Sequence, residues 1–262
     1  MDATARFEAL LAGPEPALPL DEAALLVAAH DDPDLDVDEA LGRIDELADG
    51  VRAPTLDGLL RHLFRDLGFA GAEGAAYHDP RSSYLHHVVE RRIGIPIALS
   101  ILVMEVGRRI GVPLAGVSMP GHFLIRDKVD PEVFIDPFAR GAQLDRRGAQ
   151  ARFHVVQGPG SVFHPDFLEP TDRRSIVRRV LANLEGIAMH RGDRDMLEWV
   201  LRLRNAVPGA ATGDRRRLAA LLATIGKVVE GAAVLEALAV DLEGEEARAA
   251  TDAAQRLRAQ LN

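Results

Sequence analysis

Apolar residues recur at helical spacing through the first third of the chain. This pattern predicts helices over 21–30, 36–47 and 55–67. Thr55 is placed to cap the third helix, and Gly68 is placed to end it. The second helix is expected to bury Ala40, Leu41, Ile44 and Leu47, and the third to bury Leu56, Leu60, Leu63 and Leu67.

The middle of the chain contains a segment that is apolar on nearly every side. Residues 83–93 predict a short helix, after which Gly94 and Pro96 interrupt the pattern. Proline suits the first turn of a helix because the N–H that it lacks would be unpaired there. The run 97–104 therefore predicts a second helix that is buried all round, with Gly111 as its expected end.

Three strand-like runs follow, at 114–118, 122–126 and 132–136. We predict that the last two form a hairpin whose pairing centres on Val129, which sets His122 opposite Asp136.

Side-chain alternation in this hairpin separates two faces. One face is the expected core layer, and the other carries the polar pair, which we expect to face the start of the central helix. Arg126 and Glu132 would be cross-strand neighbours near the turn. The first face holds Phe123, Ile125, Val133 and Ile135, and the second holds His122, Leu124, Phe134 and Asp136.

The last third is again helical by pattern. Thr171 can cap a helix that runs through 176–187. Segments 192–201 and 226–235 both open with glycine and lie 34 residues apart, which is the tetratricopeptide period. Their apolar residues match at only some positions, so an unrepeated bundle of helices is the alternative.

The composition is that of an ordinary globular protein, with 47% hydrophobic and 27% charged residues. The net charge of −9 argues against a general nucleic-acid binder, which needs a basic surface to neutralise phosphates. The absence of cysteine removes disulfides, cysteine zinc sites and thiol nucleophiles. No secretory signal pattern is present, and no uncharged apolar run approaches the ~18 residues that span a bilayer. We therefore expect a cytoplasmic protein with no cofactor, no membrane association and no nucleic-acid partner.

His122 and Asp136 are the candidate catalytic residues, because a carboxylate that orients an imidazole supplies two members of a nucleophilic triad. The alternative is a hydrogen-bonded pair that serves the structure alone. Ser100 is a weaker third candidate, since it lies about one turn beyond Pro96 on the same side of the helix. The alternative for Ser100 is a structural hydroxyl that bonds back to the Pro96 carbonyl.

A metal site is not expected. A site that combined His86 or His87 with His122 is disfavoured, because adjacent histidines on one helix point in different directions. No two histidines have the spacing of the common zinc motifs. Tyr84 is expected to be a packing residue.

Five short blocks follow one another along the middle of the chain. They are DPRSSYL at 79–85, ERRIGIPIALS at 90–100, GVP at 111–113, PGHFL at 120–124 and IDPF at 135–138. In this order they resemble a bacterial family, the SirB-type proteins, which join a transglutaminase-like domain to tetratricopeptide repeats. Members of that family are often described as regulators.

The resemblance implies a catalytic layout that has lost one member. In transglutaminase-like enzymes the nucleophilic cysteine follows a glycine by two positions at the start of the central helix, where the helix dipole lowers its pKa. That position falls at or beside Pro96, while His122 and Asp136 match the histidine and aspartate. Proline offers no nucleophile, so the resemblance does not carry transglutaminase or cysteine-protease activity to this chain.

Together these observations predict an α+β protein of two parts. Residues 1–165 would form a helical lead-in and a transglutaminase-like (papain-like) core with a small antiparallel sheet, and 171–262 a tetratricopeptide-like helical domain. We expect a non-catalytic regulatory or protein-binding module that meets a protein partner through its C-terminal helices. The alternative is a hydrolase or acyltransferase that uses a His122–Asp136 dyad as general base without a cysteine nucleophile.

Overall fold

The computed structural model describes residues 2–260 and divides into two compact units. Unit 1 ends at Asn183 and unit 2 begins at Leu184, within one long helix. The architecture is mostly helical with two small sheets, consistent with the expected α+β class. Among the described residues, no helix is long and apolar enough to cross a membrane.

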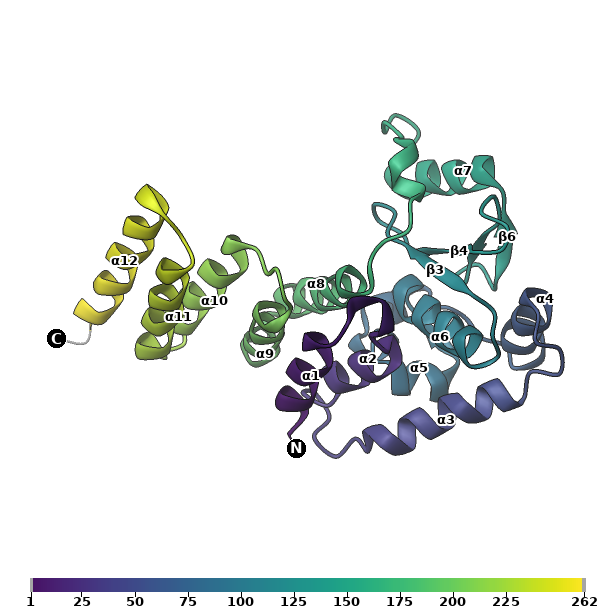
Figure 1. The fold of residues 1–262 in the computed structure, drawn as a ribbon, viewed down its shortest axis with the longest axis horizontal. Coiled ribbons are helices and arrows are strands. Elements are labelled where there is room, and N and C mark those ends of the chain that lie inside the picture. Colours follow the sequence, from purple (N-terminus) through teal and green to yellow (C-terminus); the bar gives the residue numbers. More distant parts are fainter. Residues whose placement is uncertain (1, 261–262) are drawn as a thin grey trace. The chain divides into compact units, whose positions relative to one another are not determined.

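Unit 1 is built around one helix that is buried over all but its last two residues (Figure 1). Its helices are α1 (Ala3–Ala12), α2 (Leu20–Ala28), α3 (Val37–Asp49), α4 (Leu56–Leu60), α5 (Leu85–Arg91), α6 (Pro96–Arg109), α7 (Arg146–Gln157) and the first part of α8 (Arg173–Arg191). The sequence pattern did not predict α1 or α7.

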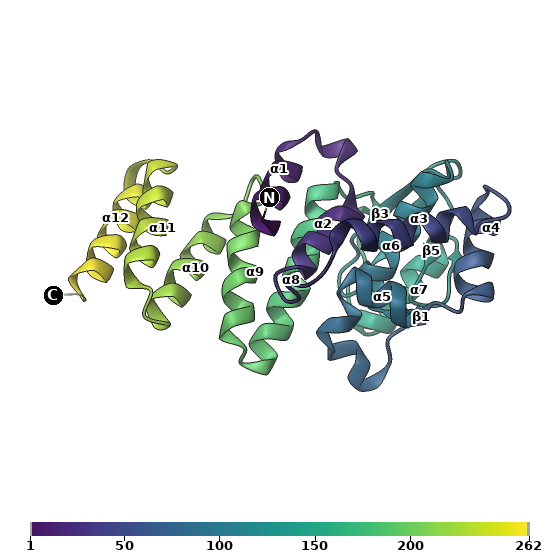
Figure 2. The same ribbon diagram turned by 90° about the horizontal axis from the view of Figure 1, so that it is seen from below.

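Helix α6 lies at the centre of unit 1, as its apolar sequence predicts. Every residue from Pro96 to Gly107 is buried, and Pro96 occupies the first turn. One side of α6 contacts helices α2, α3, α4 and α5, and its other side contacts strands β3 and β4 (Figures 1 and 2). The helix ends before Gly111, whose φ of +79° is a left-handed conformation that glycine adopts without strain.

The main sheet is antiparallel, in the order β3-β4-β5-β6. Its strands are β3 (Leu114–Val117), β4 (Leu124–Asp127), β5 (Phe134–Asp136) and β6 (Ala142–Leu144). Figure 1 shows this sheet between α6 on one face and α7 on the other. A second ribbon pairs β1 (Ala70–Gly71) in parallel with β2 (Ile93–Gly94).

The predicted hairpin register is wrong by two positions. Ile125 pairs with Ile135, and Arg126 with Phe134, so the pairing centres on residue 130 instead of Val129. The shift arises in the turn, where Asp127 N–H donates to the Val133 carbonyl at 3.0 Å. An even shift preserves the alternation of side chains, so the two predicted faces survive.

Arg126 and Glu132 are therefore not cross-strand neighbours. Arg126 donates to the Pro131 carbonyl at 2.7 Å and pairs with Glu169 at 3.2 Å. Glu132 pairs with Arg146 at the start of α7, also at 3.2 Å.

Helix α4 continues into a π-helical segment, Arg61–Asp66, which the sequence pattern predicted as ordinary helix. The Thr55 hydroxyl caps α4 as predicted, accepting from Gly58 N–H at 3.1 Å. The wider helical turn changes the buried side: Leu59, Leu60, Leu63 and Phe64 are buried, whereas Leu56 and Leu67 are only partly so.

The start of α8 is attached to unit 1 by charged groups. The N-cap residue of α8 is Asp172 and not the predicted Thr171, because the Asp172 side chain accepts a hydrogen bond from Ser175 N–H at 2.8 Å. Arg173 forms an ion pair with Glu105 of α6, whose carboxylate is fully buried and also accepts from Arg108 at 2.6 Å. This ion cluster holds the first turns of α8 against α6.

Unit 2 continues with four more helices, α9 (Arg194–Ala206), α10 (Thr212–Thr224), α11 (Val228–Val240) and α12 (Gly244–Ala259). Consecutive helices pack on one another, and α10, α11 and α12 share a small core of alanine and leucine side chains. A buried ion network joins Glu185, Arg204 and Asp214, with Arg204 3.1 Å from Asp214. These contacts make unit 2 a compact helical array.

Candidate functional site

His122 and Asp136 meet, although they are not opposite one another in the sheet. Asp136 ends β5 and is fully buried, while His122 lies in the turn before β4. The His122 Nε2 atom is 3.0 Å from Asp136 Oδ1. Because a carboxylate can only accept, Nε2 carries the hydrogen of this bond. The other ring nitrogen, Nδ1, is then the one that could act as a base.

Gly121 fixes the turn that presents His122. Its φ of +71° lies in the left-handed region. A Cβ at this position would stand 2.2 Å from the Gln157 side chain at the end of α7, so a larger residue would displace the turn from the helix.

Three groups surround the Asp136 carboxylate. Oδ1 accepts from His122 and from Ala139 N–H, the latter at 3.2 Å. Oδ2 lies 2.9 Å from Arg152 Nε, a close ion pair that lacks the alignment of a hydrogen bond. Burial alone would raise the pKa of Asp136, but the hydrogen bond and charge of His122, with Arg152 and Ala139 N–H, lower it below its ordinary value. Asp136 is therefore a carboxylate.

Helix α7 covers the face that carries the dyad. Its Ala149 and Phe153 pack against Leu124 and Phe134 in one apolar cluster. The expectation that His122 and Asp136 face the start of α6 is thus not met for the carboxylate, whose second oxygen faces Arg152 of α7. Both faces of the hairpin are buried, because α6 covers the other one.

Aromatic and cationic groups hold the His122 ring and backbone. Phe138 meets the imidazole edge-to-face, with 5.9 Å between ring centroids, and Tyr77 meets Phe138 at 6.0 Å. Arg179 of α8 donates to the His122 carbonyl at 3.1 Å and to the Met119 carbonyl at 2.9 Å. The exposed fraction of His122 is only 5%, so little of the ring meets solvent.

The start of α6 carries no nucleophile. Pro96 occupies the first helical position, and Ile95 N–H donates to the Ser82 carbonyl at 2.9 Å. The Ser100 hydroxyl is fully buried and donates to the Pro96 carbonyl at 2.8 Å. Its proton is therefore committed to the helix backbone and not to His122.

The side chains of His86 and His87 were expected to point in different directions, but their rings lie close together, with 4.0 Å between ring centroids. Burial and the neighbouring His87 lower the pKa of His86 to about 4, so its imidazole is neutral at pH 7. No group of three or more metal-ligating side chains occurs in the part of the chain that the structure describes. Tyr84 is buried and stacks on His86.

Sequence reasoning missed the two arginines of the site. Arg152 belongs to α7. The sequence marks the start of this helix with Asp145, whose side chain caps it by accepting a hydrogen bond from Gly148 N–H at 2.7 Å. Arg179 belongs to α8, which also carries Arg173, Arg174 and Arg178. No pattern within α8 distinguishes Arg179 from its neighbours, because its partners lie about 60 residues earlier.

Comparison with known proteins places these residues in a family. Residues 20–182 match the transglutaminase-like superfamily. A UPF0162 protein of Xylella fastidiosa is 38% identical over 183 residues, which cover 65% of each chain. A UPF0162 protein of Pseudomonas aeruginosa is 33% identical over 66% of each chain.

A more distant relative is eukaryotic. The F-box only protein 21 of Mus musculus is 36% identical over 103 residues, which cover 36% of this chain and 16% of that protein. This chain matches just under two thirds of the length of the Xylella fastidiosa protein. No solved structure matches this chain. The match over residues 20–182 includes the central helix, the sheet and both members of the dyad, and the chain belongs to the transglutaminase-like superfamily.

Proposed function

We propose that this protein is a non-catalytic transglutaminase-like protein that acts as a regulatory or protein-binding module. The observation that carries the proposal is Pro96 at the first turn of α6, where the layout of the superfamily needs a nucleophile. Proline has no side-chain nucleophile, and the nearest hydroxyl in sequence, that of Ser100, is bound to the Pro96 carbonyl.

The burial of the dyad supports the same proposal. An acyl acceptor or a water molecule must reach within hydrogen-bond distance of a general base. His122 is 5% exposed and is packed against Phe138. Asp136 is paired with both His122 and Arg152, an arrangement that stabilises the end of β5 whether or not chemistry occurs.

An acyl-transfer assay tests the absence of catalysis. The full chain is incubated with a glutamine-containing peptide and hydroxylamine, and hydroxamate formation is measured. We expect the wild-type protein and the His122→Ala variant to give the same rate as a blank without protein. A wild-type rate above the blank that His122→Ala abolishes would overturn the proposal.

The helices of unit 2 are the proposed partner surface, and we propose that they are tetratricopeptide-like. Helices α9 and α11 begin 34 residues apart, at Arg194 and Val228. Gly192 and Gly226 precede them, each with a positive φ. Repeats of this kind present extended binding surfaces. The end of α11 adds an exposed apolar side chain, Val240, at 84% exposure.

Substitutions in the full chain test this surface better than truncation, because α8 also supports His122 through Arg179. The set of proteins bound by immobilised wild-type chain is compared with the set bound by a Val229→Glu/Val240→Glu variant. Val129→Glu in unit 1, at a position that is 76% exposed, is the matched control. We expect the double variant to lose partners that the control keeps. An unchanged set would count against a partner surface on α11.

The alternative function is a hydrolase or acyltransferase with His122 as general base. The 3.0 Å contact between His122 and Asp136 favours it, because the bond leaves Nδ1 as the proton acceptor. Ester hydrolysis by the wild-type chain distinguishes the two proposals. The alternative requires a rate that falls by at least about tenfold in His122→Ala, in line with general-base contributions.

A further inference from the structure

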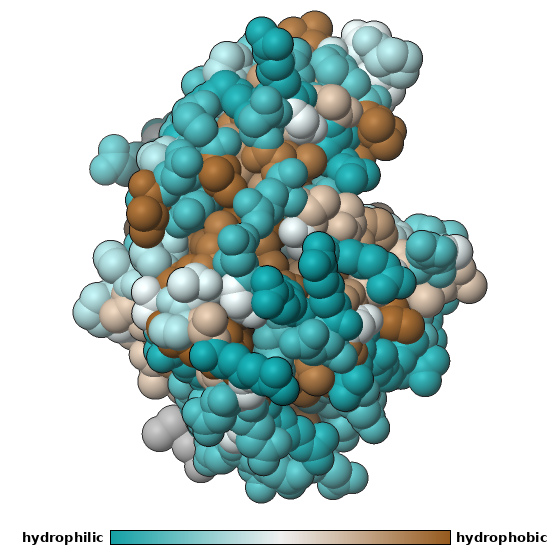
Figure 3. All heavy atoms as spheres, turned by 90° about the vertical axis from the view of Figure 1, so that its right-hand side faces the viewer, coloured by the Kyte–Doolittle hydropathy of each residue, from teal (hydrophilic) through white to brown (hydrophobic). Residues whose placement is uncertain are grey.

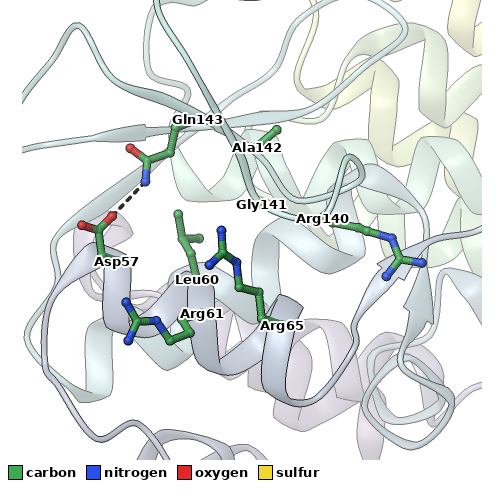
Figure 4. A pocket seen from close by; sticks show the side chains of 8 residues that line it. All are labelled: Asp57, Leu60, Arg61, Arg65, Arg140, Gly141, Ala142 and Gln143. Carbon is green, nitrogen blue, oxygen red and sulfur yellow. Dashed lines mark hydrogen bonds between the residues drawn. The ribbon is translucent and has the colours of Figure 1, made fainter.

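A polar pocket lies in unit 1 between α4 with its π-helical continuation and the turn that joins β5 to β6 (Figure 4). Its volume is about 480 Å³. One wall comes from α4 and the π-helical segment, and the other from the turn and the first residues of β6. The side chains that matter to its chemistry are Asp57, Leu60, Arg61, Arg65, Arg140 and Gln143.

Three arginines give this pocket a positive charge. Among the described residues, Arg61, Arg65 and Arg140 form no ion pair or side-chain hydrogen bond with protein, and all three are exposed. In Figure 4 the Arg65 guanidinium reaches toward Gly141, the Arg61 guanidinium lies on the side of Asp57, and the Arg140 side chain points away from the other two.

The single acid of the lining does not neutralise them. The Asp57 carboxylate accepts a hydrogen bond from the Gln143 amide at 2.9 Å, drawn as the dashed line in Figure 4. In a chain of net charge −9, three arginines around one pocket with a single acid stand out. Guanidinium groups stay charged at every physiological pH.

The backbone around the pocket is unusual on both walls. The wall with Arg61 and Arg65 is π-helical, a conformation that is rare and often found at functional sites. On the other wall, Arg140 has a φ of +55°, which costs about 1 kcal/mol for a residue with a side chain. Gly141 follows with a φ of +72°, and a Cβ there would stand 2.3 Å from the Phe64 ring. The two walls therefore approach each other closely only because residue 141 is glycine.

We propose that this pocket binds a phosphate-bearing anion with at least two phosphate groups. Planar guanidinium groups pair with phosphate oxygens through two parallel hydrogen bonds. The volume lies within the range of small-molecule sites and exceeds what one phosphate fills. Leu60 is the single large apolar side chain of the lining. The face drawn in Figure 3 is mixed, with hydrophilic side chains between hydrophobic patches. A charged ligand suits this lining better than an apolar one.

Pyrophosphate is the probe that tests the proposal. Its binding to the full wild-type chain is measured by titration calorimetry at low ionic strength. The Arg61→Gln/Arg65→Gln/Arg140→Gln variant is expected to bind at least about tenfold more weakly, since the loss of one hydrogen bond to a charged group already weakens binding by about that factor or more. Arg65→Lys keeps the charge but loses the planar guanidinium that can donate two parallel hydrogen bonds, and it should weaken pyrophosphate binding by a smaller factor.

A control of equal charge separates a site from general attraction. Arg194, Arg216 and Arg248 are exposed and lie outside this pocket, and their combined change to glutamine lowers the net charge by the same amount. We expect that variant to bind pyrophosphate within about twofold of wild type.

Three results would overturn the proposal. The first is no binding of pyrophosphate to the wild-type chain, and the second is an equal loss of binding in the control variant. The third is succinate binding as tightly as pyrophosphate, which would assign the pocket to carboxylates. The proposal does not rest on the absence of catalysis, because none of these variants touches His122 or Asp136.

Discussion

The buried dyad and the arginine pocket lie at the two ends of the turn between β5 and β6. The charged groups of the dyad are buried and paired, whereas the arginines of the pocket are exposed and, in the part of the chain that the structure describes, unpaired. Asp136 is fully buried and is met by His122, Arg152 and a backbone N–H. The pocket keeps its arginines exposed and without a carboxylate partner among the described residues. Ala142, which lines the pocket, pairs directly with Asp136 in the sheet. A compensated buried charge organises the fold, whereas an uncompensated exposed one is available to a ligand.

From this comparison we expect the largest change in the free energy of unfolding at Asp136. The Asp136→Asn substitution keeps the shape but removes the charge that His122 and Arg152 face. We expect the free energy of unfolding to fall by about 3 kcal/mol, because breaking a buried pair leaves its partner uncompensated. Urea denaturation measures the change. Asp34→Asn, at an exposed position, is the control and should stay within about 0.5 kcal/mol of wild type. A loss below about 1 kcal/mol for Asp136→Asn would remove the contrast between the two regions.

The second effect is a loss of stability in acid. The pKa of Asp136 in the folded chain is lowered from its ordinary value of 3.8. A lowered carboxyl pKa contributes stability that is fully present above the ordinary value and is lost as the pH falls through the folded value. The stability difference between wild type and Asp136→Asn should therefore shrink as the pH falls below ~4. A difference that stays constant or grows between pH 7 and pH 3 would contradict a lowered pKa.

The third effect separates the imidazole's hydrogen bond from its bulk. His122→Gln retains an N–H donor that can reach Asp136, whereas His122→Leu retains only apolar volume. We expect the leucine variant to be less stable than the glutamine variant by about 1.5 kcal/mol, the low end of the range for a hydrogen bond to a charged group. Thermal unfolding of both variants measures this difference. Equal stabilities would mean that packing against Phe138, and not the bond to Asp136, fixes the ring.

The dyad was predictable from sequence, and its surroundings were only partly so. The alternation of side chains placed His122 and Asp136 on one face, and that alternation survived the two-residue error in register. The error arose because the turn was assumed to be symmetric about Val129. Helix α6 was clear from its continuous apolar run and from Pro96 at its start. Arg152 was missed because Asp145, the N-cap residue of α7, marks the start of a helix but not a partner for Asp136.

The arginine pocket could not be predicted in the same way. Arg61 and Arg65 lie far from Arg140 in the sequence, and only the close approach of Gly141 to Phe64 brings their walls together. The pattern of leucines around 55–67 predicts an α-helix, while the chain forms a π-helical segment there. Local propensity does not specify that wider turn, which depends on packing against the rest of unit 1.

The smallest expected effect is a slight gain in the free energy of unfolding, opposite in sign to the loss expected for Asp136→Asn. Arg61 and Arg65 are about one helical turn apart and repel each other, because no carboxylate pairs with either of them in the described chain. Arg65→Gln should therefore leave the free energy of unfolding unchanged or raise it by up to about 0.5 kcal/mol in a buffer without phosphate. Adding pyrophosphate should raise the melting temperature of wild type and raise that of Arg65→Gln less, since a ligand stabilises only the state that binds it. If Arg65→Gln instead destabilised the chain by more than about 1 kcal/mol, Arg65 would be a structural residue like Arg152, and the two sides of the turn would no longer differ in kind.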